Sequence, residues 1–353
     1  MGIVLLVQKI LKSKPMRAPD FWKNRSLVST LLLPASLFYV IGGYLRQALA
    51  KPIKVTVPVI CIGNLSAGGS GKTPIARSIA ETLMTKGFSP HIISRGYGGT
   101  EQGPLRVNPD IHKATEVGDE PLMLSSTLPT WVSRDRVKGV KAAIEQGADI
   151  ILLDDGFQNP KLFKDLSLIV VDNNLGFGNG RVIPAGPLRE SIRSGIARAD
   201  ALVLMNSNNT PSNPEILSLG DIPLLHAHVE PATEPKPELE DNPISLQKAL
   251  NRKSIFAFAA IGYPQKFYTT LQQQGAVLKD TRDFPDHHQY SRSDLTDIIK
   301  SAEALGVDLI YTTEKDYAKV PVDLRNNIHC LPIRAVWDNP NALMKLLNRL
   351  TGL

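Results

Sequence analysis

Cysteine is scarce in this sequence, with only Cys61 and Cys330 among 353 residues. Two cysteines cannot form a disulfide framework, and neither has the spacing of zinc ligands. The sequence also lacks internal repeats and any nucleic-acid-binding motif. We therefore expect neither a disulfide scaffold, nor a zinc module, nor a nucleic-acid-binding protein, and a reducing cytosol fits the two thiols.

Acidic residues are nearly absent from the first 25 positions, where Asp20 is the only one. The whole chain carries a net charge of +6 and has a pI near 9.2. Few aromatic residues accompany the basic ones, so a membrane surface is a better partner than nucleic acid. The basic residues of this stretch are Lys9, Lys12, Lys14, Arg17, Lys23 and Arg25.

Charge is also missing from Ser26 to Leu45, SLVSTLLLPASLFYVIGGYL. A helix of that length would just cross a bilayer core, although Pro34 and Gly42-Gly43 argue against a straight span. Arg46 interrupts the approach to a possible signal-peptide cleavage site, so a signal peptide is disfavoured. A buried core helix remains an alternative. We expect membrane association, and the sequence does not decide between a spanning and a flat-lying helix.

Apolar runs that end on polar residues alternate with helical stretches between residues 55 and 205. Such strands are typical of a parallel sheet covered on both faces, with ligand groups at the strand C-termini. A helix over 136–146 would supply one crossover. The strand candidates are residues 55–62, 91–94, 148–153, 167–171 and 201–205.

Asn, Ser, Pro and acidic residues dominate from Asn206 to Asn242, which indicates a boundary. A second α/β unit follows it. The expected division is an N-terminal membrane-associated helical segment (1–50), a nucleotide-binding domain (51–225) and a smaller C-terminal α/β domain that closes a cleft (226–353). Late strand candidates are 224–229, 254–260, 309–313 and 328–333, and 341–350 should form a terminal helix.

The segment CIGNLSAGGSGKTPIA at 61–76 has the pattern of a phosphate-binding loop between a strand and a helix. Glycines let backbone N–H groups converge on phosphate oxygens at a helix N-terminus. Lys72 would reach the β- and γ-phosphates, and Thr73 would ligate magnesium. Ser66 departs from the usual first glycine. The expected loop comprises Ser66, Ala67, Gly68, Gly69, Ser70, Gly71, Lys72 and Thr73, and the fold class is α/β with a P-loop NTPase-like, mostly parallel sheet flanked by helices.

Asp154 and Asp155 follow four apolar residues and should lie at a strand end beside this loop. A magnesium-binding acid of the Walker B kind belongs there. One or two carboxylates suffice when phosphates and waters complete the coordination shell. The alternative is a turn or helix N-cap in the DDGFQ segment.

Two further acid-containing segments are candidates for catalysis. Asp119-Glu120 precedes Pro121, so a helix N-cap and a base that acts on an attacking hydroxyl are equally open. The segment 284–290, FPDHHQY, offers an acid-oriented histidine, whereas zinc binding is disfavoured because adjacent histidines point apart. A surface His-His loop is the alternative.

Two polar segments complete the set of candidates. The arginines of 181–193 could bind anionic charge or form a solvated basic face. The residues Thr312 to Asp316 could line the same cleft or form a solvated strand end.

Together these motifs resemble the tetraacyldisaccharide 4′-kinase family, the membrane-associated lipid A kinases of Gram-negative bacteria. They span most of the chain in one order, which makes the resemblance specific. The motifs are GNLSAGGSGKTP at 63–74, SRGYGG at 94–99, GDEP at 118–121, SRDR at 133–136, DDGFQ at 154–158, PAGPLRE at 184–190, FPDHHQY at 284–290 and TEKD at 313–316.

The resemblance implies transfer of the γ-phosphate of ATP, with Mg2+, to the 4′-hydroxyl of an acylated glucosamine disaccharide 1-phosphate, giving a lipid IVA-type precursor. It implies a catalytic dyad of Asp119 and His287, and a location on the cytoplasmic face of the inner membrane without an obligate protein partner. The alternative function is a membrane-targeted P-loop switch or partitioning ATPase. The implied supporting residues of the cleft are Glu120, Arg134, Gln158 (also beside the nucleotide), Arg189, Glu190 and Asp286.

Overall fold

The computed structural model describes residues 19–205, 221–232 and 246–351. The expectations for the basic residues at 9–17, and for most of the boundary segment 206–242, lie outside these ranges.

A nine-stranded sheet forms the body of the larger unit, in the order β13-β8-β7-β6-β1-β5-β2-β4-β3. Its centre is β1 (Val59–Gly63), which pairs in parallel with β5 (Ile150–Asp154) and β6 (Leu166–Asp172). Only the edge pairs β3–β4 and β13–β8 are antiparallel. The predicted mostly parallel sheet is therefore confirmed. The other strands are β2 (Pro90–Ser94), β3 (Leu105–Arg106), β4 (Thr130–Val132), β7 (Ala201–Met205), β8 (Leu224–Pro231) and β13 (Ile333–Trp337).

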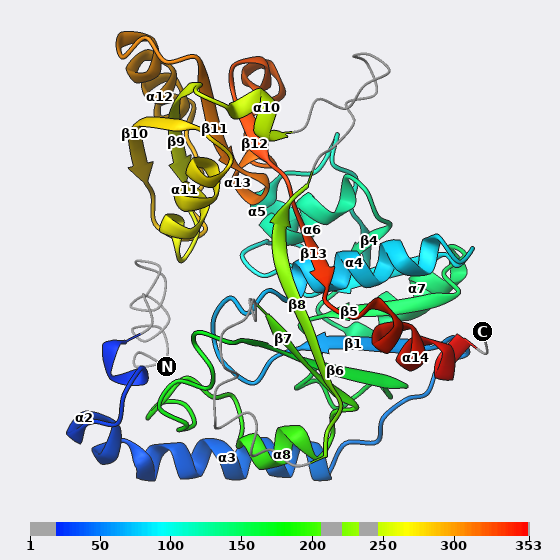
Figure 1. The fold of residues 1–353 in the computed structure, drawn as a ribbon. Coiled ribbons are helices and arrows are strands. Elements are labelled where there is room, and N and C mark those ends of the chain that lie inside the picture. Colours follow the sequence, from blue (N-terminus) through cyan, green and yellow to red (C-terminus); the bar gives the residue numbers. More distant parts are fainter. Residues whose placement is uncertain (1–18, 206–220, 233–245, 352–353) are drawn as a thin grey trace.

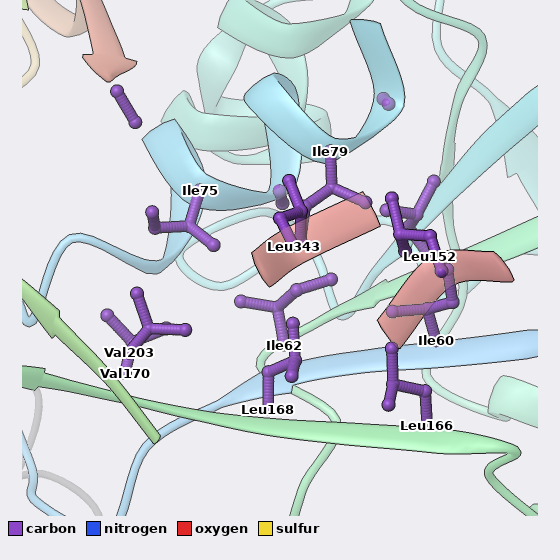
Figure 2. Close-up of a cluster of buried hydrophobic side chains, with 14 of the residues drawn as sticks. Ile60, Ile62, Ile75, Ile79, Leu152, Leu166, Leu168, Val170, Val203 and Leu343 are labelled. Carbon is purple, nitrogen blue, oxygen red and sulfur yellow. The ribbon is translucent and has the colours of Figure 1, made fainter. Parts of the chain in front are cut away.

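The central strands are apolar on both sides because helices cover both faces of the sheet. Ile60 and Ile62 of β1 pack against α4 (Lys72–Met84) and α14 (Pro340–Thr351), the cluster drawn in Figure 2. Their neighbours Val59 and Cys61 point to the opposite face and belong to a second buried cluster, which includes Val140 and Ala143 of α7 (Arg136–Glu145). Burial of Cys61 raises the pKa of its thiol to about 11, as suits an inert core residue. Shorter helices of this unit are α5 (Ala114–Val117), α6 (Asp119–Ser125) and α8 (Ile192–Ile196).

A smaller unit contains a four-stranded parallel sheet in the order β10-β9-β11-β12 (upper left in Figure 1). Its strands are β9 (Ser254–Ala259), β10 (Val277–Asp283), β11 (Leu309–Thr313) and β12 (His329–Leu331). Its helices are α10 (Leu246–Leu250), α11 (Pro264–Gln273), α12 (Arg292–Ala304), α13 (Glu314–Tyr317) and the 3-10 turn η2 (Val322–Asn327).

The division between the sheets differs from the predicted ranges at two places. The predicted boundary at 225/226 falls inside β8, a strand of the large sheet. The predicted strand 328–333 is two strands, β12 and β13, which belong to different sheets and are separated by Pro332, a residue without an N–H for a ladder. The smaller sheet is therefore inserted between β8 and β13, which run side by side at one edge of the large sheet (Figure 1).

The uncharged N-terminal run forms two helices, α2 (Leu27–Leu31) and α3 (Leu33–Ala48), after the turn η1 (Asp20–Trp22). The two helices are separated at Leu32, and Pro34 stands in the first turn of α3, where proline is tolerated. Within the described ranges, no helix has both the length and the apolar character that crossing a bilayer requires.

Helix α3 reverses the usual pattern of a surface helix. Its buried residue is a serine, Ser36, whereas Phe38 and Tyr44 are 76% and 70% exposed. The Ser36 hydroxyl donates to the Val182 carbonyl at 2.8 Å and accepts from the Ala185 N–H at 3.2 Å. The alternative of a buried core helix is wrong, because α3 lies on the larger unit through its polar side and exposes its large apolar residues (lower edge in Figure 1).

Candidate active site

The phosphate loop follows β1 and ends at Gly71, which has φ of +85° and caps α4. A Cβ on Gly68 or Gly69 would meet no heavy atom within 4 Å, so the loop backbone faces open space. Lys72 and Thr73 begin the helix. This is the strand, loop and helix arrangement that the sequence predicts for a phosphate cradle.

The PAGPLRE segment (residues 184–190) supports the phosphate loop through backbone hydrogen bonds. The Ala67 N–H donates to the Pro187 carbonyl at 2.8 Å, and the Arg189 N–H donates to the Leu65 carbonyl at 2.7 Å. Ser66 forms an isolated bridge with Leu188. The same segment holds the polar side of α3, so the N-terminal helices and the phosphate loop share one support.

Asp154 ends β5 beside the start of α4. One of its carboxylate oxygens lies 3.4 Å from the Thr73 hydroxyl, and the other is buried without a hydrogen-bond partner. Burial, with the nearby Glu120 carboxylate, raises the pKa of Asp154 to about 7. A buried carboxylate that favours neutralisation is the type of group that binds a hard cation.

Asp155 differs from Asp154 in environment although the two are adjacent. Its carboxylate lies 2.8 Å from the Arg189 guanidinium and 3.9 Å from the Lys72 ammonium. Burial opposes ionisation, but these two cations outweigh it and lower the pKa of Asp155. Its φ of +56° is unusual for a non-glycine residue. With this backbone conformation, the Asp155 carboxylate faces Lys72 and Arg189.

Gln158 connects three parts of the larger unit. Its side-chain amide donates to the Asn64 carbonyl at 2.9 Å and to Glu190 at 3.2 Å, and accepts from Arg189 at 3.3 Å. The backbone carbonyl of Gln158 accepts a hydrogen bond from the Arg46 guanidinium of α3 at 2.6 Å. Gln158 is therefore held beside the loop from both sides.

Asp119 is the first residue of α6, and the N-cap is Gly118, so the alternative that Asp119 serves as the N-cap is wrong. The carboxylate is 3% exposed and instead faces the smaller unit, where His287 Nδ1 lies 3.1 Å and Gln289 Nε2 3.2 Å away. Burial favours the neutral acid, but His287 and the ammonium groups of Lys319 and Lys315 together lower the pKa of Asp119.

His287 is the histidine that faces the cleft. Its φ is +62°, its Nε2 lies 3.3 Å from the Lys315 ammonium, and the Tyr97 ring packs edge-on at 5.5 Å. His288 turns away toward Asp294 at 3.2 Å. The two histidines lie in one loop but have separate environments, and only His287 contacts the larger unit through Asp119.

The remaining predicted residues surround this pair less closely. Lys315 lies 3.6 Å from Asp286 and 4.0 Å from Glu120. Arg134 is exposed at the cleft and donates to the Gly99 carbonyl at 3.5 Å. Asp286, Glu120 and Arg134 thus line the cleft without binding Asp119 directly.

The structure gives different answers for the two polar segments, residues 312–316 and the arginines of 181–193. Thr312 and Asp316 are fully buried, so a solvated strand end is wrong. In the arginine segment, Arg189 contacts Asp155 and Arg181 binds the hydroxyls of Ser29 and Thr30. The arginine segment therefore attaches the N-terminal helix at Arg181 and contributes to the candidate site at Arg189.

Sequence reasoning missed Lys319, Gln289 and Arg46. Gln289 lies inside the FPDHHQY motif and could have been singled out. Lys319 stands three residues after Asp316, a helical spacing that hints at their contact. No local signal connects Lys319 to Asp119, which is 200 residues earlier in the chain.

A magnesium ion fits the residues at the strand end. Thr73 and Asp154 supply two oxygens, one carboxylate oxygen is unpartnered, and the Ser70 hydroxyl is also buried without a partner. Among the described residues no group of three or more His, Cys, Asp or Glu side chains could hold a metal by itself. Phosphate oxygens and water would have to complete the shell, as magnesium prefers.

The β1–loop–α4 arrangement beside β5 defines the chain as a P-loop phosphate-binding protein. Comparison with known proteins narrows this class to one family. The family model for tetraacyldisaccharide-1-P 4′-kinase matches residues 28–351, and the chain belongs to that family.

Relatives and a solved structure agree with this assignment. The tetraacyldisaccharide 4′-kinase of Paramagnetospirillum magneticum is 44% identical and is matched over 95% of this chain and 99% of its own length. That of Rhodospirillum centenum is 42% identical, over 94% and 96%. A crystal structure of LpxK from Aquifex aeolicus in complex with ATP superposes with a TM-score of 0.71 at 30% identity, covering 92% of this chain and 99% of that one. Family membership decides in favour of a kinase over a switch or partitioning ATPase.

Proposed function

We propose that this protein transfers the γ-phosphate of ATP to the 4′-hydroxyl of an acylated glucosamine disaccharide 1-phosphate, a step of lipid A biosynthesis. The observation that carries the proposal is the contact of Asp119 with His287 across the two units, at a cleft that His287 and the phosphate loop both line. A phosphate-binding switch needs the loop, whereas transfer to an alcohol also needs a group that orients and deprotonates the acceptor.

In the proposed mechanism, the larger unit holds the donor. The loop N–H groups and Lys72 bind the β- and γ-phosphates, and Arg189 keeps Asp155 beside Lys72. Thr73 and Asp154 would ligate Mg2+, which supplies neutralisation of the phosphate charge. Gln158 and Glu190 hold the DDGFQ turn in place near the nucleotide.

The smaller unit supplies the acceptor side and, we infer, closes the cleft over bound substrate. His287 donates its Nδ1 proton to Asp119, so that an oxygen of this carboxylate is aligned to accept the proton of the acceptor hydroxyl. In a loose phosphoryl-transfer transition state that proton leaves late, so a carboxylate with a lowered pKa is basic enough. Glu120, Arg134 and Asp286 line the space available to the sugar.

We further propose that α2 and α3 lie in the cytoplasmic leaflet of the inner membrane. The protein would there meet its partner, the lipid substrate. Large apolar side chains exposed on α3, beside a polar attachment to the protein, are typical of an interfacial helix. The location brings the cleft to a substrate whose acyl chains stay in the bilayer.

The function is tested with γ-labelled ATP, purified acylated disaccharide 1-phosphate in detergent micelles, and the full-length protein. We expect label in the lipid fraction, and a substrate lacking the 4′-hydroxyl to take up none. Label that appears only as free phosphate, with the complete substrate present, would overturn the kinase proposal and restore the switch alternative.

Membrane association is tested by sedimentation with phosphatidylethanolamine–phosphatidylglycerol vesicles. The Phe38→Ser, Tyr44→Ser double variant should lower the partition coefficient at least about tenfold, because each ring loses apolar burial in the interface. Val322→Ser is the matched control, since Val322 is 74% exposed on the smaller unit. Equal partition of the double variant and the wild type would rule out docking through α3.

A further inference from the structure

A buried ammonium group connects the candidate base to the interior of the smaller unit. The Lys319 side chain is 2% exposed, and its Nζ lies 2.8 Å from an Asp316 oxygen and 3.6 Å from an Asp119 oxygen. It also donates to the His288 carbonyl at 2.9 Å. Lys319 therefore stands between a carboxylate of its own unit and one of the other unit.

Asp316 is arranged to hold this ammonium in place. It is fully buried, and its other oxygen accepts from the Ala260 N–H at 2.8 Å and from the Thr313 hydroxyl at 2.7 Å. The Tyr290 ring lies beside this ammonium, with its centroid 5.1 Å from Lys319 Nζ. A buried Lys–Asp pair of this kind contributes little net stability by comparison with an apolar pair, so its position calls for another explanation.

We propose that Lys319 is a positioning residue for the reaction: its fixed ammonium orients the Asp119 carboxylate and keeps it ionised when the smaller unit is seated. The inference rests on the proposed role of Asp119 as base. Without Lys319, a carboxylate only 3% exposed would rely on His287, Gln289 and the more distant Lys315, with the Glu120 and Asp316 carboxylates nearby. Asp119 would then be held less firmly and would protonate more readily.

Substituting Lys319 alone would leave Asp316 buried and unpaired, which can unfold the protein. The test therefore uses Lys319→Met combined with Asp316→Asn, which removes both charges of this buried pair and keeps an acceptor for the Ala260 N–H and the Thr313 hydroxyl. The matched control is Lys253→Met with Asp308→Asn, an exposed pair in the same unit at 3.7 Å. Rates are referred to the concentration of ATP-analogue binding sites, so partial unfolding does not obscure the result.

We expect the Lys319/Asp316 variant to lose kcat for lipid phosphorylation by about one to two orders of magnitude. Its affinity for the ATP analogue should stay within about twofold of wild type, and the acidic limb of its kcat profile should move to higher pH. The control should keep the wild-type rate and profile.

Two outcomes would overturn the inference. One is a kcat within about twofold of wild type, which would leave Lys319 without influence on the chemistry. The other is a reduced kcat with an unmoved pH profile, which would be a general structural loss. Failure of the proposed function itself can be distinguished from both outcomes, because the wild-type protein would then transfer no label to lipid.

Discussion

The two sides of the cleft are built in different ways. The donor side consists of strand ends and one helix start on a sheet whose central strands β1, β5, β6 and β7 are fully buried. The acceptor side is assembled from the start of α6 and a loop of the smaller unit, whose edge strand β10 is largely exposed. The donor side is thus complete within one sheet, whereas the acceptor side exists only while the two units stay together.

This difference predicts that damage to the donor side abolishes turnover and nucleotide binding together. Lys72→Ala removes the ammonium of the phosphate loop, which lies 3.9 Å from Asp155, and should lower kcat by at least about 10³-fold, because the phosphate charge loses its partner. Lys86→Ala, an exposed lysine just beyond the same helix, is the control and should be neutral. The comparison fails if Lys72→Ala retains a near-normal rate in the label-transfer assay.

Damage to the acceptor side should separate catalysis from nucleotide binding. Asp119→Ala should lower kcat by about 10²- to 10³-fold while the Kd for an ATP analogue changes less than about twofold. Calorimetric titration with the analogue provides the second quantity. An equal loss in both would instead make Asp119 a nucleotide or metal ligand of the donor side.

The contact between the units can be weakened without touching the site. The Arg77 guanidinium donates to both oxygens of Glu314 at 2.9 and 3.1 Å, and both side chains are largely buried. Arg77→Met should lower the free energy of unfolding by about 2–4 kcal/mol, since it leaves a partly buried carboxylate unpaired. It should also raise KM for the lipid more than KM for ATP.

The control for this contact is Glu314→Gln, which keeps a hydrogen-bond acceptor and should have a smaller effect. Thermal unfolding and steady-state kinetics give the two readouts. An Arg77→Met enzyme with wild-type stability and wild-type lipid KM would mean that the acceptor side does not depend on how the units are held.

The smallest effect is expected at the two strands that connect the units. His228 on β8 lies 3.0 Å from Asp338 and 2.8 Å from Glu230; burial disfavours its charged form, but these carboxylates outweigh burial and raise its pKa. A raised histidine pKa stabilises the fold below about pH 6.5, and this stabilisation is lost as pH rises through the folded-state value.

Asp338→Asn should therefore lower Tm at pH 6 by no more than about 2 °C and have less effect at pH 8.5. Differential scanning calorimetry of both proteins at both values provides the comparison. A larger destabilisation at pH 8.5 than at pH 6 would contradict the assigned sign.

The sequence predicts the donor side of the structure better than the acceptor side. The strands β1, β5, β6 and β7 are short apolar runs that end on polar residues, and their positions match the predicted ranges within a few residues. The insertion of the smaller sheet was not predicted, because the pairing of β8 with β13 joins residues about 100 positions apart. The exposed strand β10 lacks an apolar run and was missed.

The site shows a similar limit. The phosphate loop and Asp154 are local motifs, whereas Lys319 approaches Asp119 only through the way the two units are seated. The motifs of the family identified Asp119 and His287 as a pair, and no spacing or periodicity in the chain would have brought them together.

The most direct test of the central claim is a double-mutant cycle at Asp119 and His287, measured as label transfer from ATP to lipid. If the two units contribute one catalytic device, the Asp119→Ala, His287→Ala double variant should be about as slow as the slower single variant. Losses that simply multiply would contradict the account, because Asp119 and His287 would then act independently of each other.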